Sequence, residues 1–228
     1  MDKAETWLSK ALDYRFRDVR LLEQALTHRS ATGANNERLE FLGDAILDVV
    51  VSEAVFHARP DATEGDLSRL RASLVKDESL AALAADLGLG PHLILGGGER
   101  KSGGHRRESI LADAVEAIFG AVYLDAGFDA SREVIARAFG KRLEEFPPIE
   151  ELRDPKTRLQ EWLQARGRGL PQYELVAETG EAHRRRFEVS CRIEGDAEPT
   201  HGEGTTRRAA EQSSAQRMLV RLERTDSA

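Results

Sequence analysis

The chain has 228 residues, of which 40% are hydrophobic and 32% are charged, a composition typical of a globular protein with one large domain or two smaller ones. The apolar runs are much shorter than the roughly 20 residues of a membrane-spanning helix, and the start lacks the pattern of a signal peptide. The single cysteine excludes an internal disulfide and a cysteine zinc site. We therefore expect a cytoplasmic protein. The net charge of −7 argues against a nucleic-acid partner, but all of the excess negative charge lies in residues 1–150, and the electrically balanced remainder clusters its cations at 184–186 and 207–208.

Apolar residues recur at helical spacing through the first part of the chain, and this periodicity predicts helices at 21–27, 37–58, 64–86 and 110–126. Pro147 and Pro148 end this region, which predicts a linker at 149–153 between a helical domain of residues 1–148 and a second domain of residues 154–224. The second domain is predicted to contain a helix at 155–166, strands at 173–178, 186–193 and near 200, and a helix at 206–222. The expected fold is therefore an all-α domain followed by a small α+β domain with the order α-β-β-β-α.

The helix expected at 37–58 carries three acids in an otherwise apolar run. Glu40, Asp44 and Asp48 lie four residues apart, so their carboxylates share one face of the helix. Such a helix should be largely buried, and burying an unpaired carboxylate is costly. Because no Lys or Arg lies three or four positions from Glu40 or Asp44, these acids need a positive partner from elsewhere.

A second acid pair occurs in the helix expected at 110–126. Asp113 and Glu116 share a face at a spacing of three, among apolar neighbours. If the two helices pack together, four carboxylates converge, and this set of hard oxygen ligands suits Mg²⁺, or Mn²⁺ in its place. A carboxylate-held ion of this kind favours phosphodiester hydrolysis. The alternative is that Arg or Lys residues of other helices satisfy the acids as buried ion pairs, since structural networks resemble functional sites.

Four segments resemble the ribonuclease III family in the same order along the chain. They are LTHRS at 26–30, NERLEFLGDAILDVV at 36–50, which resembles the signature helix of the family, EGDLSRLRASLV at 64–75 and SILADAVEAIFGAVYLDAG at 109–127. The resemblance implies that Glu40, Asp44, Asp113 and Glu116 bind metal, with Asp44 and Glu116 most directly associated with catalysis.

The same resemblance implies a homodimer that cuts double-stranded RNA, leaving 5′-phosphate and 3′-hydroxyl ends with short 3′ overhangs, and that acts on precursor ribosomal RNA, structured messenger RNA and transfer RNA precursors. Phe41 would contribute to the dimer contact, where Gly43 would permit close packing, although core packing is an equal alternative for Phe41. Glu37 and Glu64 match acidic positions near the RNA path, or are solvated charges at helix ends.

The C-terminal part resembles the double-stranded-RNA-binding domain through KTRLQEWLQ at 156–164 and GEGTTRRAAE at 202–211. Such domains read the shape of A-form RNA through 2′-hydroxyl groups and phosphates. A polar helix face suits the sugar edges, and Arg207 and Arg208 at a helix N-terminus suit phosphates, although the family usually has lysines there. His183 matches the loop that the family domain places in the next minor groove, or is an ordinary exposed turn histidine. The expected RNA-binding residues are Thr157, Gln160, Glu161, Gln164, His183, Arg207 and Arg208.

Two other functions are alternatives to an endoribonuclease. A non-cleaving double-stranded-RNA-binding regulator or scaffold would use the acids structurally, and a phosphohydrolase of small substrates would leave the C-terminal domain unexplained. The glycine-rich segment at 96–104 is not a phosphate-binding loop, because Arg100 occupies the place of the glycine required before Lys-Ser. We therefore expect a flexible connector at this segment and no nucleotide cofactor.

Overall fold

The computed structural model describes residues 2–181, 185–195 and 198–226. The chain forms two compact units, residues 1–149 and 150–228, and each is described by itself. Within these described ranges, no helix is long and apolar enough to cross a membrane.

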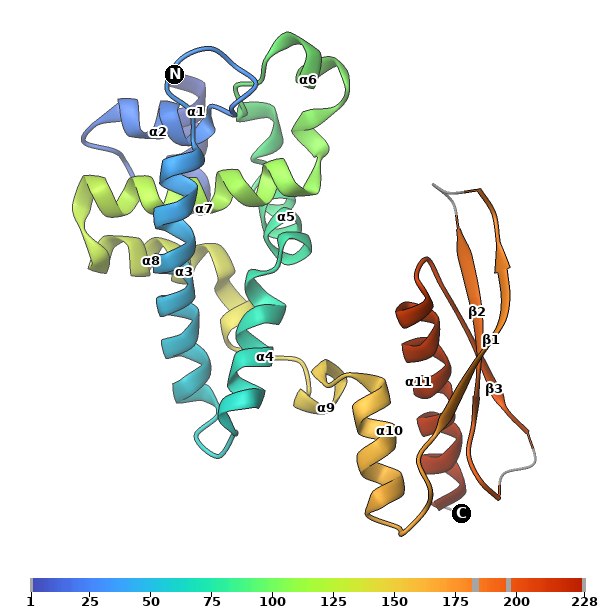
Figure 1. Ribbon diagram of the computed structural model, residues 1–228. Coiled ribbons are helices and arrows are strands. Elements are labelled where there is room, and N and C mark those ends of the chain that lie inside the picture. The colour runs from blue at the N-terminus through green and yellow to red at the C-terminus, as the bar shows by residue number, and fades with distance from the viewer. Residues whose placement is uncertain (1, 182–184, 196–197, 227–228) are drawn as a thin grey trace. The chain divides into compact units, whose positions relative to one another are not determined.

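The first unit is helical, and Figure 1 shows its elements in chain order. Its α-helices are α1 (Asp2–Leu12), α2 (Val19–Leu26), α3 (Glu37–Ala58), α4 (Glu64–Val75), α5 (Asp77–Asp86), α6 (Gly97–Lys101), α7 (Glu108–Ala126) and α8 (Phe128–Phe139). Three short 3₁₀ turns, η1 (Gly90–His92), η2 (Gly104–Arg106) and η3 (Gly140–Leu143), connect or follow them. The predicted all-α character of this part is confirmed.

Helix α7 is the centre of the first unit. It packs against α2, α3, α5 and α8, and most of its residues from Ile110 to Val122 are buried. Such all-round burial explains why its sequence is apolar on nearly every face. Gly127 ends the helix with a positive φ of 87°, a conformation that glycine adopts without steric cost.

The single helix expected at 64–86 is wrong, because the structure divides it into α4 and α5. Lys76 is extended, with φ −64° and ψ 150°, so the helical hydrogen bonding is interrupted there. Thr63 caps α4 by accepting a hydrogen bond from the N–H of Asp66 at 3.3 Å. The acids Asp77 and Glu78 then begin α5, where negative charge stabilises a helix N-terminus.

The glycine-rich segment at 96–104 has more order than the expected flexible connector. It contains α6 and leads into η2. The N–H of Gly96 donates to Ser30 Oγ at 3.0 Å, and Ser102 Oγ donates to the backbone oxygen of Glu99 at 3.0 Å. The first contact attaches the segment to the loop that precedes α3, and the second lies within the segment.

The second unit has the predicted order α-β-β-β-α, which is confirmed. Its elements are α10 (Pro155–Gln164), β1 (Gln172–Thr179), β2 (Arg186–Arg192), β3 (Thr200–Gly204) and α11 (Arg207–Asp226), and the short helix α9 (Ile149–Leu152) precedes them. The three strands form one antiparallel sheet in the order β1-β2-β3, with an irregularity between Leu175 and Ala177. Helix α11 packs on β2 and β3, and α10 packs on α11.

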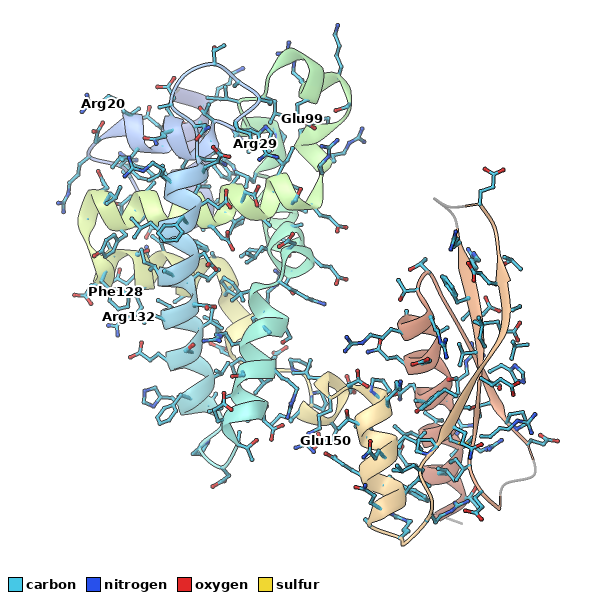
Figure 2. All side chains as sticks on the ribbon, viewed as in Figure 1. Arg20, Arg29, Glu99, Phe128, Arg132 and Glu150 are labelled. Atoms are coloured by element: carbon cyan, nitrogen blue, oxygen red, sulfur yellow. The ribbon has the colours of Figure 1, made fainter. Side chains whose placement is uncertain are left out.

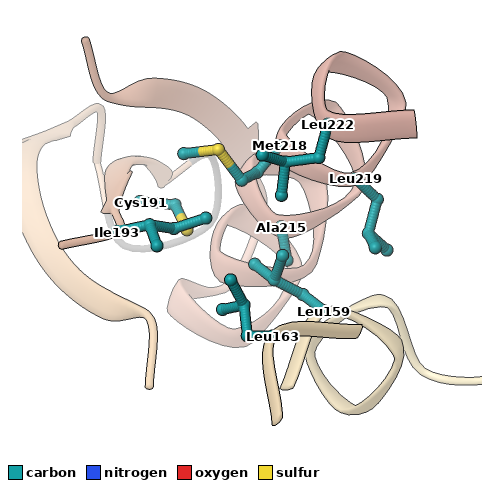
Figure 3. Close-up of a cluster of buried hydrophobic side chains, with 8 residues drawn as sticks. All are labelled: Leu159, Leu163, Cys191, Ile193, Ala215, Met218, Leu219 and Leu222. Atoms are coloured by element: carbon teal, nitrogen blue, oxygen red, sulfur yellow. The ribbon is translucent and has the colours of Figure 1, made fainter. Parts of the chain in front are cut away.

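A small hydrophobic core holds the second unit together (Figure 3). Leu159 and Leu163 of α10 lie at a spacing of four on one helix face, so both point into the core. The other buried members are Cys191, Ile193, Ala215, Met218, Leu219 and Leu222. Because one face of α10 is committed to this core, its opposite face is left to solvent.

Candidate active site and nucleic-acid interface

Helices α3 and α7 cross in direct contact, and two glycines make the contact possible. A Cβ atom on Gly43 would overlap the carbonyl oxygen of Glu116, and one on Gly120 would overlap that of Leu39. The expectation that Gly43 permits close packing at a dimer contact is therefore wrong, because the close partner is α7 of the same chain. Figure 1 shows this crossing of α3 and α7, which places the backbone of Gly43 against that of Glu116.

Glu116 lies at the centre of this crossing and its pKa is strongly perturbed. Burial is the largest cause, and the charges of Asp44, Glu40 and Asp113 follow, so that the pKa of Glu116 rises to about 8. Burial and neighbouring carboxylates both disfavour the charged form of an acid. The charges of the other three predicted acids therefore all act on Glu116.

Two of the other acids show the same effect. Burial and the charge of Asp113 raise the pKa of Glu40, and burial and the charge of Asp77 raise the pKa of Asp113. Arg29 opposes the shift at both positions. Burial and acidic neighbours together thus outweigh the effect of the local cations on these two pKa values.

The alternative of buried ion pairs receives no support at this crossing. Within the described ranges, none of the four acids forms an ion pair or a side-chain hydrogen bond, whereas Asp48, the third acid of the α3 stripe, pairs with Arg71 at 3.6 Å. Arg29 pairs with Glu37 at 3.7 Å, and its side chain is 71% exposed. Figure 2 labels Arg29 near the end of α3 at which Glu37 begins the helix.

The four acids are neighbours, but they do not form a closed ligand cage. In the part of the chain that the structure describes, no group of three or more His, Cys, Asp or Glu side chains is positioned to hold a metal ion. The chemistry of the donor set nevertheless fits a hard divalent cation, since carboxylates that repel one another are stabilised by positive charge. Mg²⁺ keeps several waters and uses few direct carboxylate ligands, which suits an open arrangement.

Two further charged residues act on the site and were not identified from the sequence. Arg29 comes from the loop before α3, outside the one helical turn to which local spacing applies. The charge of Asp77 raises the pKa of both Asp113 and Glu116, but the apolar periodicity predicts a continuous helix through it. The signal for Asp77 was present, because an acid followed by Glu78 is typical of a helix start.

Glu37 and Glu64 begin α3 and α4, respectively, and both are exposed. Glu37 lies one turn before Glu40 and adds to the charge that raises the pKa of Glu40. Glu64 accepts a hydrogen bond from Ser68 at 2.8 Å and follows the far end of α3. A rise of about 1.5 Å per helical residue keeps Glu64 well away from Glu40 within one chain, so the structure brings only Glu37 close to the acids.

An exposed apolar face runs along α3. Phe41 is 80% exposed, so core packing within the chain is excluded for it. Val49 and Phe56 are 55% and 62% exposed on the same helix. Because large apolar side chains are costly to expose to water, this face is suited to burial against another surface.

The residues expected to contact RNA lie on the surface of the second unit. Those on α10 are all exposed on the side away from the core, namely Thr157, Gln160, Glu161 and Gln164. Arg207 and Arg208 are the first two residues of α11, and both are exposed. His183 and Arg184 lie outside the residues that the structure describes.

Comparison with known families and proteins gives consistent results. Residues 18–143 match the family described as Ribonuclease-III-like, and residues 155–222 match the Double-stranded RNA binding motif. Together these matches cover both structural units.

Curated relatives extend over nearly the whole chain. A protein named Ribonuclease 3 from Alkalilimnicola ehrlichii is 57% identical over 95% of this chain and 95% of its own length. Another of that name, from Pseudomonas aeruginosa, is 56% identical over 94% of each. Among solved structures, the nuclease domain of ribonuclease III from Campylobacter jejuni, described as having a flexible region involved in dimer formation, is 46% identical over 61% of this chain and 98% of that one, with a TM-score of 0.59.

Proposed function

Because this chain belongs to the ribonuclease III family and is a double-strand-specific endoribonuclease, we propose that it hydrolyses double-stranded RNA with Mg²⁺ held by Glu40, Asp44, Asp113 and Glu116. The observation that supports this most strongly is the set of four acids, without ion pairs in the described ranges, at the crossing of α3 and α7. The family is generally metal-dependent. Mn²⁺ is expected to substitute, because it also prefers oxygen ligands.

The four acids have distinct parts in this proposal. When bound, a divalent ion lowers the pKa of the attacking water and stabilises negative charge on the scissile phosphate. Asp44 and Glu116 are the proposed catalytic residues, and Glu40 and Asp113 complete the set of metal ligands. Without metal, burial and the neighbouring carboxylates raise the pKa of Glu116 to about 8, and a bound divalent cation would favour its charged form.

The proposed reaction breaks the bond between phosphorus and the 3′ oxygen. The water oxygen joins the phosphorus atom and loses a proton, and the departing 3′ oxygen gains one. The products then carry 5′-phosphate and 3′-hydroxyl ends, with short 3′ overhangs. The proposed substrates in the cell are precursor ribosomal RNA, structured messenger RNA and transfer RNA precursors.

The second unit is the proposed double-stranded-RNA-binding domain. The exposed face of α10, with Thr157, Gln160, Glu161 and Gln164, would hydrogen-bond to sugar edges, and Arg207 and Arg208 would contact phosphates. His183 is proposed for the adjacent minor groove. Glu37 and Glu64 are proposed to lie near the RNA path. We propose domain limits of 1–148 and 154–224, and a cytoplasmic location consistent with a single, unpaired cysteine.

We also propose that the chain acts as a homodimer through the exposed apolar face of α3. Phe41 would be buried in both copies, because a two-fold interface uses the same residues twice. Phe41→Ala is expected to raise the dimer dissociation constant about 100-fold or more, given the apolar area lost from both sides. Sedimentation equilibrium measures this. Leu170→Ala is the matched control, at an exposed apolar side chain of the second unit, and an unchanged mass for Phe41→Ala would reject this interface.

The experiment that tests the proposed function compares a labelled duplex RNA with its separate single strands. Incubation with Mg²⁺ should shorten the duplex and leave the single strands intact, and a chelator should stop all cleavage. Product 5′ ends should accept a new label only after phosphatase treatment. Retarded but uncut duplex in the presence of Mg²⁺ would instead support the non-cleaving regulator.

A further inference from the structure

The first turns of α10 and α11 are tied together by acidic side chains. Asp154 Oδ1 accepts a hydrogen bond from the N–H of Lys156 at 2.8 Å, which caps α10. The other oxygen, Oδ2, accepts one from Gln212 Nε2 at 2.7 Å and lies 3.7 Å from Arg208 Nη2. Asp154 therefore joins the starts of both helices.

Glu211 forms a second and tighter connection. Its Oε2 accepts a hydrogen bond from Lys156 Nζ at 2.5 Å, and its Oε1 accepts one from Arg207 Nε at 3.1 Å. The Lys156 ammonium group also lies 4.5 Å from the centre of the Tyr173 ring, a cation–π contact. The Glu211 side chain is only 15% exposed, so water competes weakly for its oxygens.

These contacts offset a concentration of positive charge. Lys156, Arg207 and Arg208 gather where two helix N-termini add their own partial positive charge. Burial acts to raise the pKa of Glu211, but hydrogen bonds and charge from Lys156 and Arg207 outweigh it and lower that pKa. Glu211 is consequently an anion at neutral pH and stabilises the cations beside it.

The geometry leaves the phosphate-binding end of Arg207 available. Only its Nε is bonded to Glu211, and the guanidinium side chain remains 59% exposed. In the described ranges its two Nη groups have no hydrogen-bond acceptor. An arginine held by one nitrogen presents a fixed fork to a phosphate, and a fixed donor loses less conformational freedom on binding than a mobile one.

We propose that Glu211 is a positioning residue for double-stranded-RNA binding, which fixes Arg207, together with Lys156, so that the Nη groups of Arg207 face the RNA phosphates. This rests on the proposed role of Arg207 in RNA binding. In this proposal a negatively charged side chain strengthens the binding of an anionic ligand.

Two accounts of Glu211 predict opposite signs for the same substitution. If Glu211 is only a negative charge near the RNA, Glu211→Gln makes the surface more positive, so RNA binds more tightly and with a steeper dependence on salt. If Glu211 positions Arg207, the substitution frees the guanidinium group and weakens a phosphate contact. The dissociation constant then rises about tenfold, and the slope of log K against log salt becomes shallower by about one.

The test measures binding of the full chain, with chelator, to a duplex RNA longer than the roughly 16 base pairs that such a domain spans, over a series of salt concentrations. Glu211→Asp keeps the charge but shortens the side chain, so positioning predicts weaker binding and charge alone predicts no change. Glu174→Gln is the matched control, since this exposed carboxylate of β1 has no ion pair in the described ranges. We expect it to leave the affinity unchanged or slightly higher.

A double-mutant cycle with Arg207→Ala separates positioning from general loss of structure. If Glu211 acts through Arg207, adding Glu211→Gln to Arg207→Ala weakens binding little further. Tighter binding by Glu211→Gln, or additive losses in the cycle, would overturn the inference while the wild type still binds RNA. Failure of the wild type to bind duplex RNA would overturn the proposed function itself.

Discussion

Of the residues in the candidate active site, Glu116 destabilises the fold most. Its carboxyl group is partly buried among Asp44, Glu40 and Asp113, and its pKa is raised from 4.5 to about 8. Between these pH values the folded chain binds more protons than the unfolded chain. The contribution of Glu116 to the free energy of unfolding therefore falls as pH rises through this window.

Glu116→Gln removes that effect. In chelator above pH 8, we expect the variant to be more stable than the wild type by on the order of 2 kcal/mol, less than the full shift implies because solvent screens part of the repulsion. Near pH 5 the gain should be much smaller. Urea unfolding at both pH values measures the difference, with the exposed Glu144→Gln as control. A variant that gains nothing at high pH would show that Glu116 is not strained.

Residue spacing was sufficient to predict the four acids as a group, and insufficient to predict their surroundings. Glu40 and Asp44 share a face because they lie one helical turn apart, and Asp113 and Glu116 do so for the same reason. Arg29 and Asp77 influence the site from a loop and from the start of another helix. Their proximity depends on the tertiary arrangement, which no local periodicity contains.

At the scale of elements, the site depends on how closely α3 and α7 approach. The periodicity of apolar residues predicted both helices, since a buried helix retains a long apolar run. It did not predict that Gly43 contacts the backbone of Glu116, because a glycine in a helix is consistent with many packing partners. It also missed the extended Lys76 between α4 and α5, where helix-forming residues continue on both sides.

Gly43→Ala is expected to separate the two helices. The added Cβ has no room beside the Glu116 carbonyl oxygen, so the free energy of unfolding should fall by about 3 kcal/mol or more, and metal-dependent cleavage should fall with it. Urea unfolding provides the measurement. Gly97→Ala is the control, because a Cβ there meets nothing within 4 Å; equal effects of the two substitutions would contradict the close crossing.

At the scale of the whole molecule, the sequence predicted the catalytic and binding domains more readily than the surface through which two copies would assemble. Two prolines and a change from helical to alternating periodicity predicted a second domain, and its α-β-β-β-α order is confirmed. The distribution of charge agreed, since the cations of the second unit gather at the start of α11. For Phe41 the sequence left a dimer contact and core packing as equal alternatives, and only its exposure excludes packing in the core of its own chain.

We propose that the acids at the crossing of α3 and α7 carry out the cleavage of double-stranded RNA. The most direct test compares the wild type with an Asp44→Asn plus Glu116→Gln variant and with Asp48→Asn, whose carboxylate pairs with Arg71. With Mg²⁺ and duplex RNA, the double variant should lose cleavage by about 1,000-fold or more and still bind the duplex, while Asp48→Asn should cleave within a few-fold of the wild type. Wild-type cleavage by the double variant, or an equal loss in Asp48→Asn, would contradict this assignment.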